Sequence, residues 1–490
     1  MKPSEISLIC IGHKYVYETE CTVRIFLPGE KILVKFCPDS SAADEIITRL
    51  EDTGKEILLS TEINLSRFSF LKSQKLILPR KSDDSAIERG FGVLLYELLS
   101  KATGIRPPWG ILTGVRPVRL CRRLQSQGLG KDEIAKVMVN DYLVSPQKAS
   151  LATSVLISQR DIIIKNTPDS FSLYVNIPFC PGRCLYCSFV SADIAKKGAL
   201  LPRYIELLKK EIVLVGEIAR KKRLNLHTIY LGGGTPTALS AGQLGEILAT
   251  INRNFDISSL MEYTVESGRP DTITAEKLDV MRGFGVSRIS VNPQTMNDSV
   301  LQNIGRSHTG AQTVEAFELA RKMGFSCINM DMIAGLPGES AEIFENSLKT
   351  VLALRPENIT IHTLTIKRSS SLRAQPGVFS TRIPLGDMIA TAQDSLIVSG
   401  YLPYYLYRQK GGIHNLENTG FSLPDAAGIY NIYSMEDIHT ILAVGAGSVS
   451  KICANSRIKR IFATKFPDEY ITGFDKTLIN LSLIASELNL

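Results

Sequence analysis

A strand-then-helix pattern repeats six times between residues 171 and 366, and it restricts the possible fold more than any other feature of the chain. Six short segments are rich in apolar and β-branched residues: Phe171–Phe179, His227–Gly232, Glu262–Glu266, Arg288–Val291, Cys327–Ala334 and Asn358–Ile366. The segments between them place apolar residues at helical spacing, as in Tyr204, Leu208, Ile212, Val215 and Ala219. The alternation predicts parallel strands joined by crossover helices, an α/β fold forming a partial (β/α)6 TIM-like barrel. In such folds the chemistry lies at the carboxyl ends of the strands.

Both flanks of this region differ from it, and 490 residues exceed what one hydrophobic core usually serves. The pattern of residues 1–165 predicts an α+β domain of unknown role. The segment from Ser7 to Pro38 has the pattern of antiparallel hairpins, and helical spacing begins near Asp83. We assign residues 166–385 to the core barrel and the turn-rich residues 386–490 to a C-terminal extension. A Gly- and Pro-rich stretch in the first domain carries arginines without an evident purpose: Arg106, Arg116 and Arg119.

Composition excludes several classes of protein. The formal charge of +7 arises from 56 basic and 49 acidic residues, so a nucleic-acid partner is not expected. No apolar run reaches the roughly 18–20 residues of a membrane-spanning helix, and the N-terminus lacks a signal-peptide pattern, so we expect a cytoplasmic protein. Nine cysteines, an odd number, favour reduced thiols over a disulfide framework.

Three cysteines are crowded into eight residues where the first predicted strand ends. Cys180, Cys184 and Cys187 have the spacing C-x3-C-x2-C, and Pro181 and Gly182 between them favour a loop. Three thiolates can bind three corners of a [4Fe-4S] cubane and leave one iron open for a ligand. The alternative is zinc, but structural zinc sites use four ligands, and no fourth Cys or His lies nearby in the sequence.

Further motifs follow this loop in order: YVNIPFC around it, then LGGGTPT, TVESGRP, RISVNPQTM, IGRSHT, INMDMIAGLPG and GAGSVS. With these motifs, residues from about Phe171 to Lys451 resemble the radical S-adenosylmethionine (SAM) superfamily. The resemblance is closest to the oxygen-independent coproporphyrinogen III oxidase group, which comprises HemN, HemW and HemZ proteins. The wording of LTGVRP, TVESGRPDTI and IHTLTIKRSS resembles HemZ proteins most.

This resemblance implies a [4Fe-4S] cluster on the three cysteines and S-adenosyl-L-methionine as cosubstrate. It implies that the glycine turn meets the methionine amino group and that Tyr174 and Tyr186 line the adenosine and cluster pocket, although both could be core aromatics. Polar groups at the strand ends would contact SAM, and Arg306 would bind its carboxylate unless it forms a surface salt bridge. The implied SAM-binding residues are Tyr174, Tyr186, Gly233, Gly234, Thr235, Glu266, Gln294, Arg306, Asp331 and Thr365.

The resemblance implies an oxygen-independent coproporphyrinogen III dehydrogenase, which converts propionates to vinyls and yields protoporphyrinogen IX. The expected partners are this tetrapyrrole and a low-potential electron donor such as flavodoxin or ferredoxin, and Lys367 and Arg368 could meet the propionates. One position departs from HemN, which has a cysteine two residues after the third cluster ligand, where this chain has Phe189 as in HemW. A haem-binding chaperone and a radical enzyme for another tetrapyrrole therefore stay open. Three histidines near the motifs have no assigned role: His308, His362 and His414.

Overall fold

The computed structural model describes residues 5–37, 44–367, 369–374, 384–409, 415–454 and 457–488. It divides into two compact units, Met1–Leu156 with Tyr407–Glu417, and Ile157–Leu406 with Asn418–Leu490. The domain boundaries expected near residues 165 and 385 stay a prediction. No helix in the described ranges has both the length and the apolar content needed to cross a membrane.

The first unit holds a five-stranded sheet in the order β2-β1-β3-β4-β5. Its first three strands are parallel neighbours, with β1 between β2 and β3, and the last three pair antiparallel. The strands are β1 (Glu5–Ile11), β2 (Lys31–Lys35), β3 (Asp44–Asp52), β4 (Glu56–Leu65) and β5 (Phe70–Pro79). The helices are α1 (Val16–Phe26), α2 (Asp84–Thr103), α3 (Val118–Ser126), α4 (Lys131–Tyr142) and α5 (Pro146–Ser158).

The predicted hairpins between Ser7 and Pro38 are wrong, because β1, α1 and β2 form a parallel crossover unit. Helix α1 buries Thr19, Thr22, Val23 and Phe26, which lie on one helical face. Three of these four residues are β-branched, so the segment has the composition of a strand. Packing of this face therefore overrides the local propensity.

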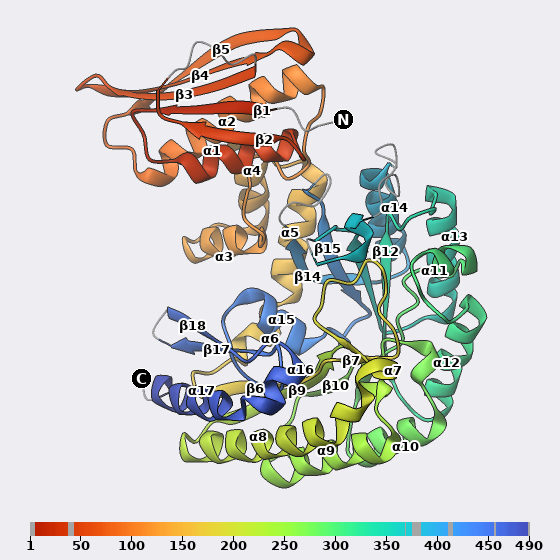
Figure 1. Ribbon diagram of the computed structural model, residues 1–490. Helices are drawn as coiled ribbons and strands as arrows, with labels where there is room; N and C mark the ends of the chain where they lie inside the picture. Colours follow the sequence, from red (N-terminus) through yellow and green to blue (C-terminus); the bar gives the residue numbers. More distant parts are fainter. Residues whose placement is uncertain are drawn as a thin grey trace. The chain divides into compact units, whose positions relative to one another are not determined.

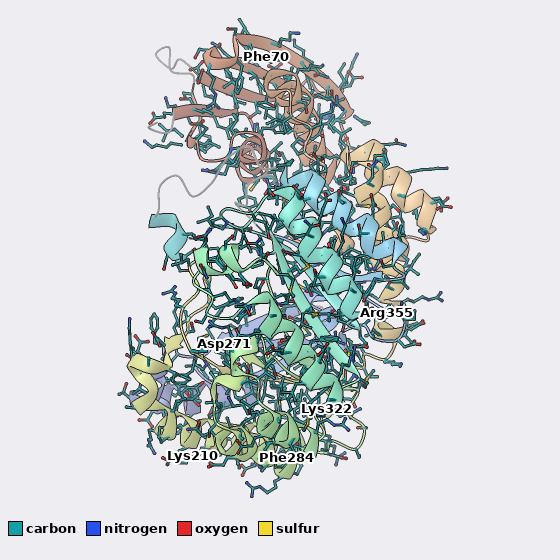
Figure 2. The ribbon with its side chains drawn as sticks, turned by 90° about the vertical axis from the view of Figure 1, so that its right-hand side faces the viewer. Phe70, Lys210, Asp271, Phe284, Lys322 and Arg355 are labelled. Atoms are coloured by element: carbon teal, nitrogen blue, oxygen red, sulfur yellow. The ribbon has the colours of Figure 1, made fainter. Side chains whose placement is uncertain are left out.

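In the second unit, the six predicted strands are present and lie side by side in chain order, each parallel to the next. They are β6 (Ser170–Ile177), β9 (Asn225–Gly233), β10 (Glu262–Val265), β11 (Arg288–Ser290), β12 (Cys327–Ala334) and β13 (Asn358–Thr363). The connecting helices form an arc outside the strands (Figure 1), namely α8 (Leu201–Lys221), α9 (Ala241–Asn254), α10 (Ala275–Gly283), α12 (Gly310–Lys322) and α13 (Ala341–Leu354). Figure 2 shows this outer side, where Lys210, Phe284, Lys322 and Arg355 mark α8 and the ends of α10, α12 and α13.

The C-terminal residues extend both edges of this sheet to eleven strands. Strand β16 (Thr440–Val444) pairs parallel with β6 and is followed by the antiparallel β17 (Val449–Ala454) and β18 (Arg457–Phe462). At the other edge, β15 (Glu417–Ser422) pairs antiparallel with β13 and adjoins β14 (Leu402–Arg408). The helices of this region are α14 (Leu385–Val398), α15 (Ile429–Glu436), α16 (Pro467–Thr472) and α17 (Phe474–Glu487). Because all six central strands are parallel, their carboxyl ends lie at one edge of the sheet.

Candidate functional site

The cysteine loop follows β6 and is fixed through the backbone of Leu185. Its N–H donates to the carbonyl of Ile304 (3.0 Å), which caps the short helix α11 (Asp298–Asn303). Its carbonyl accepts from the N–H of Leu372 (3.1 Å) and from the Ser370 hydroxyl (2.9 Å). The loop therefore has a defined shape without belonging to a helix or a long strand.

The three cysteines of this loop are free thiols in a setting that disfavours bare thiolates. Cys184 is buried, and Cys180 and Cys187 are half-buried. Burial raises the pKa of Cys180 and that of Cys187, and the neighbouring sulfurs raise the pKa of Cys187 further. No three His, Cys, Asp or Glu side chains in the described ranges converge on a position for a single metal ion. The donor set fits a cubane, whose cysteines bind separate irons.

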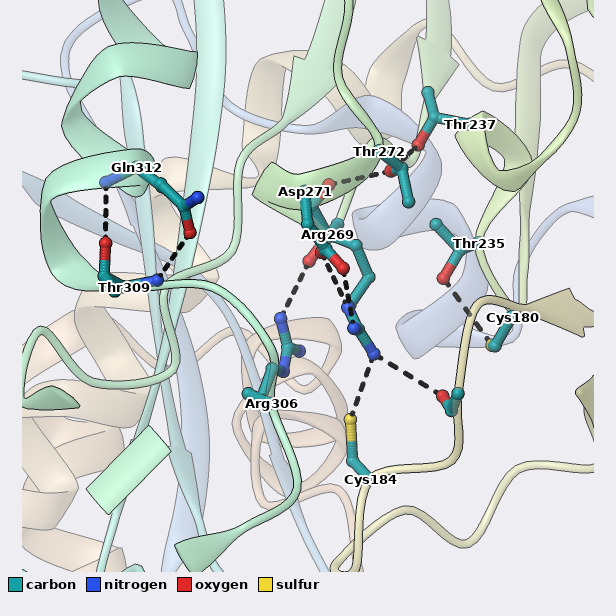
Figure 3. A network of polar contacts seen from close by, with 12 residues as sticks. Cys180, Cys184, Thr235, Thr237, Arg269, Asp271, Thr272, Arg306, Thr309 and Gln312 are labelled. Carbon is teal, nitrogen blue, oxygen red and sulfur yellow. Dashed lines mark hydrogen bonds and ion pairs between the residues drawn. The ribbon is translucent and has the colours of Figure 1, made fainter. Parts of the chain in front are cut away.

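Arg269 brings a positive charge to the cysteine loop (Figure 3), and the sequence analysis missed it. Its Nη1 donates to Cys184 Sγ (3.8 Å) and to the carbonyl of Gly182 (3.4 Å). Its Nε and Nη2 form a two-pronged ion pair with the Asp271 carboxylate, at 3.0 and 2.9 Å. Burial alone would raise the pKa of Asp271, but the guanidinium holds it below its ordinary value. The motif TVESGRPDTI contains both residues, although nothing in the sequence pointed them toward a cysteine.

The glycine turn after β9 lies directly against the cysteine loop. The N–H of Gly234 donates to the Ile177 carbonyl (2.9 Å), and that of Thr235 donates to the Phe179 carbonyl (2.8 Å). A Cβ on Gly234 would lie 2.5 Å from the Phe179 oxygen, and Gly233 has a φ of +106°, so both positions require glycine. The Thr235 hydroxyl also reaches Cys180 Sγ (3.5 Å). The predicted turn and the predicted cysteine ligand are thus in contact.

Glu266 follows β10 and faces a stack of tyrosines. Tyr230 Oη donates to Glu266 Oε1 (2.5 Å), and the Tyr230 ring lies 4.3 Å from that of Tyr430. Tyr174 stacks on both rings, at 6.1 and 6.0 Å. Burial raises the pKa of Glu266 to about 7, although the hydrogen bond from Tyr230 opposes the rise. The motifs predicted Tyr174 and Glu266 as site residues but did not indicate Tyr230 or Tyr430, and Tyr430 lies outside every motif.

Gln294 follows β11 and meets Asp331, which lies inside β12. The Gln294 N–H donates to the Asp331 carbonyl (2.9 Å), and Gln294 has a φ of +68°. Such a conformation costs a non-glycine residue about 1–3 kcal/mol and is typical of functional sites. The Gln294 Oε1 is buried and has no hydrogen-bond partner among the described residues, which makes it a candidate ligand contact.

Three side chains hold the Asp331 carboxylate. Asn292 and Asn329 each donate to one of its oxygens at 2.8 Å, and His362 Nε2 lies 3.8 Å away. Burial would raise the pKa of Asp331, but the contacts with His362 and Asn329 lower it below its ordinary value. We therefore expect Asp331 to be a fixed negative charge at this edge.

Arg306 is buried and joins two strand ends to the cysteine loop. Its Nη1 donates to the carbonyls of Gly268 and Asn292, each at 3.1 Å, and its Nη2 donates to the Tyr186 hydroxyl at 2.9 Å. The reading as a surface salt bridge is wrong, because only 8% of Arg306 is exposed. Its Nε has no partner among the described residues and is the donor left for a ligand.

The other predicted positions lie around this group. Thr365 is half-buried after β13, and its hydroxyl lies 3.4 Å from the Thr363 carbonyl. His308 is buried, and burial together with the charge of Arg306 lowers its pKa to about 4, so it is neutral. Lys367 is exposed, whereas Arg368 and His414 lie outside the described residues.

Comparisons with known proteins identify the family of the chain. Residues 174–351 match the Radical SAM superfamily, whose members use a [4Fe-4S] cluster and SAM. The chain is 35% identical over 446 residues to the oxygen-independent coproporphyrinogen-III oxidase-like protein HemZ of Bacillus subtilis, which covers 88% of both chains. It is 38% identical over 197 residues to the heme chaperone HemW of Bacillus subtilis, covering 40% of this chain and 51% of HemW.

A solved structure shares the fold. It is that of coproporphyrinogen III oxidase (HemN) from Escherichia coli, with a TM-score of 0.50 and 21% identity. The match covers 66% of this chain and 72% of HemN. The chain therefore belongs to the radical SAM superfamily and, within it, to the oxygen-independent coproporphyrinogen III oxidase group that includes HemZ.

Proposed function

We propose that this chain is an oxygen-independent coproporphyrinogen III dehydrogenase that oxidatively decarboxylates propionates to vinyls and yields protoporphyrinogen IX. The observation that carries the proposal is the loop of Cys180, Cys184 and Cys187, fixed at the carboxyl ends of a parallel sheet in a chain that matches HemZ over 88% of its length. In this proposal the three thiolates bind the cluster. The enzyme receives electrons from a low-potential donor such as flavodoxin or ferredoxin and acts in the cytoplasm.

The residues around the loop would prepare it for its cofactors. When bound by Cys180, Cys184 and Cys187, a reduced cluster would supply the low-potential electron for the reductive cleavage of SAM. Arg269 would stabilise negative charge on the Cys184 sulfur, because its guanidinium donates a hydrogen bond to that sulfur and is itself held by Asp271. Gln294 Oε1 and Arg306 Nε, two buried atoms without a hydrogen-bond partner among the described residues, would provide an acceptor and a donor for the cosubstrate. The tyrosine stack lies beside Glu266, and the Tyr230 hydroxyl donates to its carboxylate.

Glu266 has a pKa suited to a ligand with positive charge. Its carboxyl is protonated in about half of the molecules near neutral pH, because burial raises its pKa to about 7. SAM carries a sulfonium and an ammonium group, and either would favour the ionised carboxylate. In this proposal, binding of SAM releases the Glu266 proton, and Tyr174 and Tyr230 hold the carboxylate and the adenosine in place.

A haem chaperone like HemW is the second candidate. Phe189, two residues after Cys187, occupies the position where HemN has a further cysteine, and 67% of it is exposed. An exposed aromatic beside the cluster loop could pack against a flat tetrapyrrole in either function. The similarity to HemW over 197 residues favours this alternative for the same part of the chain.

Cys184→Ala should abolish cluster binding, because only two of the three cysteine ligands of the cubane would remain. We expect anaerobically reconstituted variant protein to hold little iron and to lose the cluster's visible absorbance. Cys121→Ala, at a buried cysteine of the first unit, should retain both. Equal iron contents in the two variants, or zinc in the wild-type loop, would contradict the ligand assignment.

Arg269→Gln should weaken cluster retention without unfolding the chain. Loss of an outer-shell partner typically costs about 10–100-fold in metal affinity, so iron should transfer to a chelator at least about tenfold faster than in the wild type. Arg253→Gln, at an exposed arginine of α9, is the matched control and should behave as wild type. A release rate in Arg269→Gln that equals the control would exclude this role for Arg269.

The affinity for SAM should rise with pH between about 6 and 7 and then level off. Below the pKa of Glu266 the free protein carries a proton that the bound state releases, so affinity increases by up to about tenfold per pH unit. Anaerobic calorimetry on cluster-loaded protein would measure this slope and the proton released. Glu266→Gln should bind more weakly and lack the slope, and Glu276→Gln, an exposed carboxylate, should keep it. An unchanged slope in Glu266→Gln would show that another group titrates.

Anaerobic incubation with coproporphyrinogen III, SAM and a reductant separates the two candidate functions. The dehydrogenase should form protoporphyrinogen IX and consume SAM in proportion. The chaperone should form none and should instead retain haem at one per chain through gel filtration. Product formation by wild type, with none by Cys184→Ala, supports the first function; no product despite an intact cluster overturns it.

A further inference from the structure

An apolar hollow rimmed by arginines lies in the first unit, far along the sequence from the cysteine motif. It has a volume of about 430 Å³ and is lined by Leu112, Gly114, Arg116, Pro117, Arg119, Leu120, Arg123 and Tyr142. This volume is in the range of small-molecule sites. The lining includes three arginines and no aspartate or glutamate. It is formed by the LTGVRP segment, α3 and the end of α4, which the proposed function leaves without a role.

The positions of two arginines are unfavourable for the stability of α3, the helix that carries them. Arg119 is in the first turn of α3, where the helix dipole disfavours cations, and the first turn holds no acidic residue. Arg119 and Arg123 are four residues apart, so two like charges are neighbours on one helical face. Neither forms an ion pair with any residue that the structure describes. An anion bound between them would relieve both unfavourable interactions.

The floor of the hollow is fixed by backbone contacts. The Ile111 N–H donates to the Tyr142 carbonyl (2.9 Å), and Arg408 donates to the carbonyls of Leu112 and Gly114. The Ile111 bond holds the segment before α3 to the last residue of α4, and the two other bonds hold the same segment to Arg408. The cavity is therefore part of the folded unit and does not depend on the position of one exposed side chain.

Two arginines donate hydrogen bonds to the side chain of Tyr142. Its hydroxyl accepts from Arg123 Nη2 (3.1 Å) and from Arg89 Nη1 (3.5 Å), and the Arg89 guanidinium lies 5.6 Å from the ring centre. Two cations thus share one neutral oxygen. A guanidinium binds most strongly to a carboxylate or phosphate, with which it forms two parallel hydrogen bonds.

We propose that this hollow is a binding site for a small organic anion. Arg119 and Arg123 would bind its carboxylate or phosphate group, and Leu112, Leu120 and the Tyr142 ring would contact its apolar or aromatic part. The ligand must have both an anionic group and an apolar part, because the hollow is lined by arginines and by apolar side chains. This proposal is independent of the proposed dehydrogenase activity and gives the first unit a function of its own.

Calorimetry on the cluster-loaded, full-length chain tests the site with naphthyl phosphate, naphthoate and neutral naphthol, and with inorganic phosphate and acetate. We expect at least one naphthyl anion to bind saturably and at least tenfold more tightly than naphthol and the corresponding small anion. The better of the two naphthyl anions identifies phosphate or carboxylate as the preferred group. Arg119→Gln and Arg123→Gln should each weaken binding about tenfold. Arg49→Gln, at an exposed arginine of β3 in the same unit, should not change it.

Several results would overturn the proposal. They are the absence of saturable binding by both naphthyl anions, equal binding of naphthol, and unchanged affinity in the two α3 variants. Arg119 and Arg123 are exposed, so their replacement should leave the thermal unfolding midpoint near that of Arg49→Gln. Should either variant be unstable, the fall of wild-type affinity with increasing salt gives a second test, and an affinity independent of salt would reject the site.

Discussion

The backbone hydrogen bonds of Leu185 are the constraint on which the candidate site depends. A loop with Pro181 and Gly182 cannot satisfy its own backbone groups as a helix or strand does, so partners must come from elsewhere. Ile304 supplies one acceptor, and Leu372 supplies one donor, from segments more than 100 residues further along the chain. The side chain of Leu185 packs against a buried apolar cluster that also includes Leu372. The thiols are thereby positioned by the segments after α11 and β13, and their spacing in the sequence would not be sufficient alone.

Parallel strand pairing explains why the polar residues of distant motifs meet. A parallel register places every carboxyl end at the same edge, so Glu266, Gln294 and Asp331 converge although 65 residues separate the first from the last. The local backbone then adapts to this edge. Gln294 adopts a positive φ while its backbone forms an isolated bridge with Met332, so the strained residue is held by two backbone hydrogen bonds to β12. The strain leaves a buried amide oxygen without a partner where a ligand is expected.

The sequence predicted the six central strands because each is a short apolar run with its own turn. It failed for α1, because Thr19, Thr22 and Val23 have strand propensity and only their packing shows the helical face. It pointed to those residues of the candidate site that lie in motifs, such as Cys184 and Glu266, and their roles stay a prediction. It could not find Tyr430, which comes from α15 and reaches the site only because β16 places the C-terminal residues beside β6. A contact across more than 160 residues has no local signal.

The charges at this edge are divided in a way that suits a dipolar ligand. Arg269 contacts Cys184, and Arg306 contacts Tyr186, so the cysteine loop is lined by cations that are themselves buried or paired. Asp331 in β12 lies close enough to Glu266, which follows β10, to raise the pKa of Glu266, and the two carboxyl groups are the acidic side of this edge. Thiolates with a cluster carry negative charge, whereas SAM carries two cationic groups and one carboxylate. A single metal ion at the cysteine loop would need only the cations near that loop. The edge has cations near the cysteine loop and carboxyl groups beside them, and this combination suits a cluster together with a charged cosubstrate.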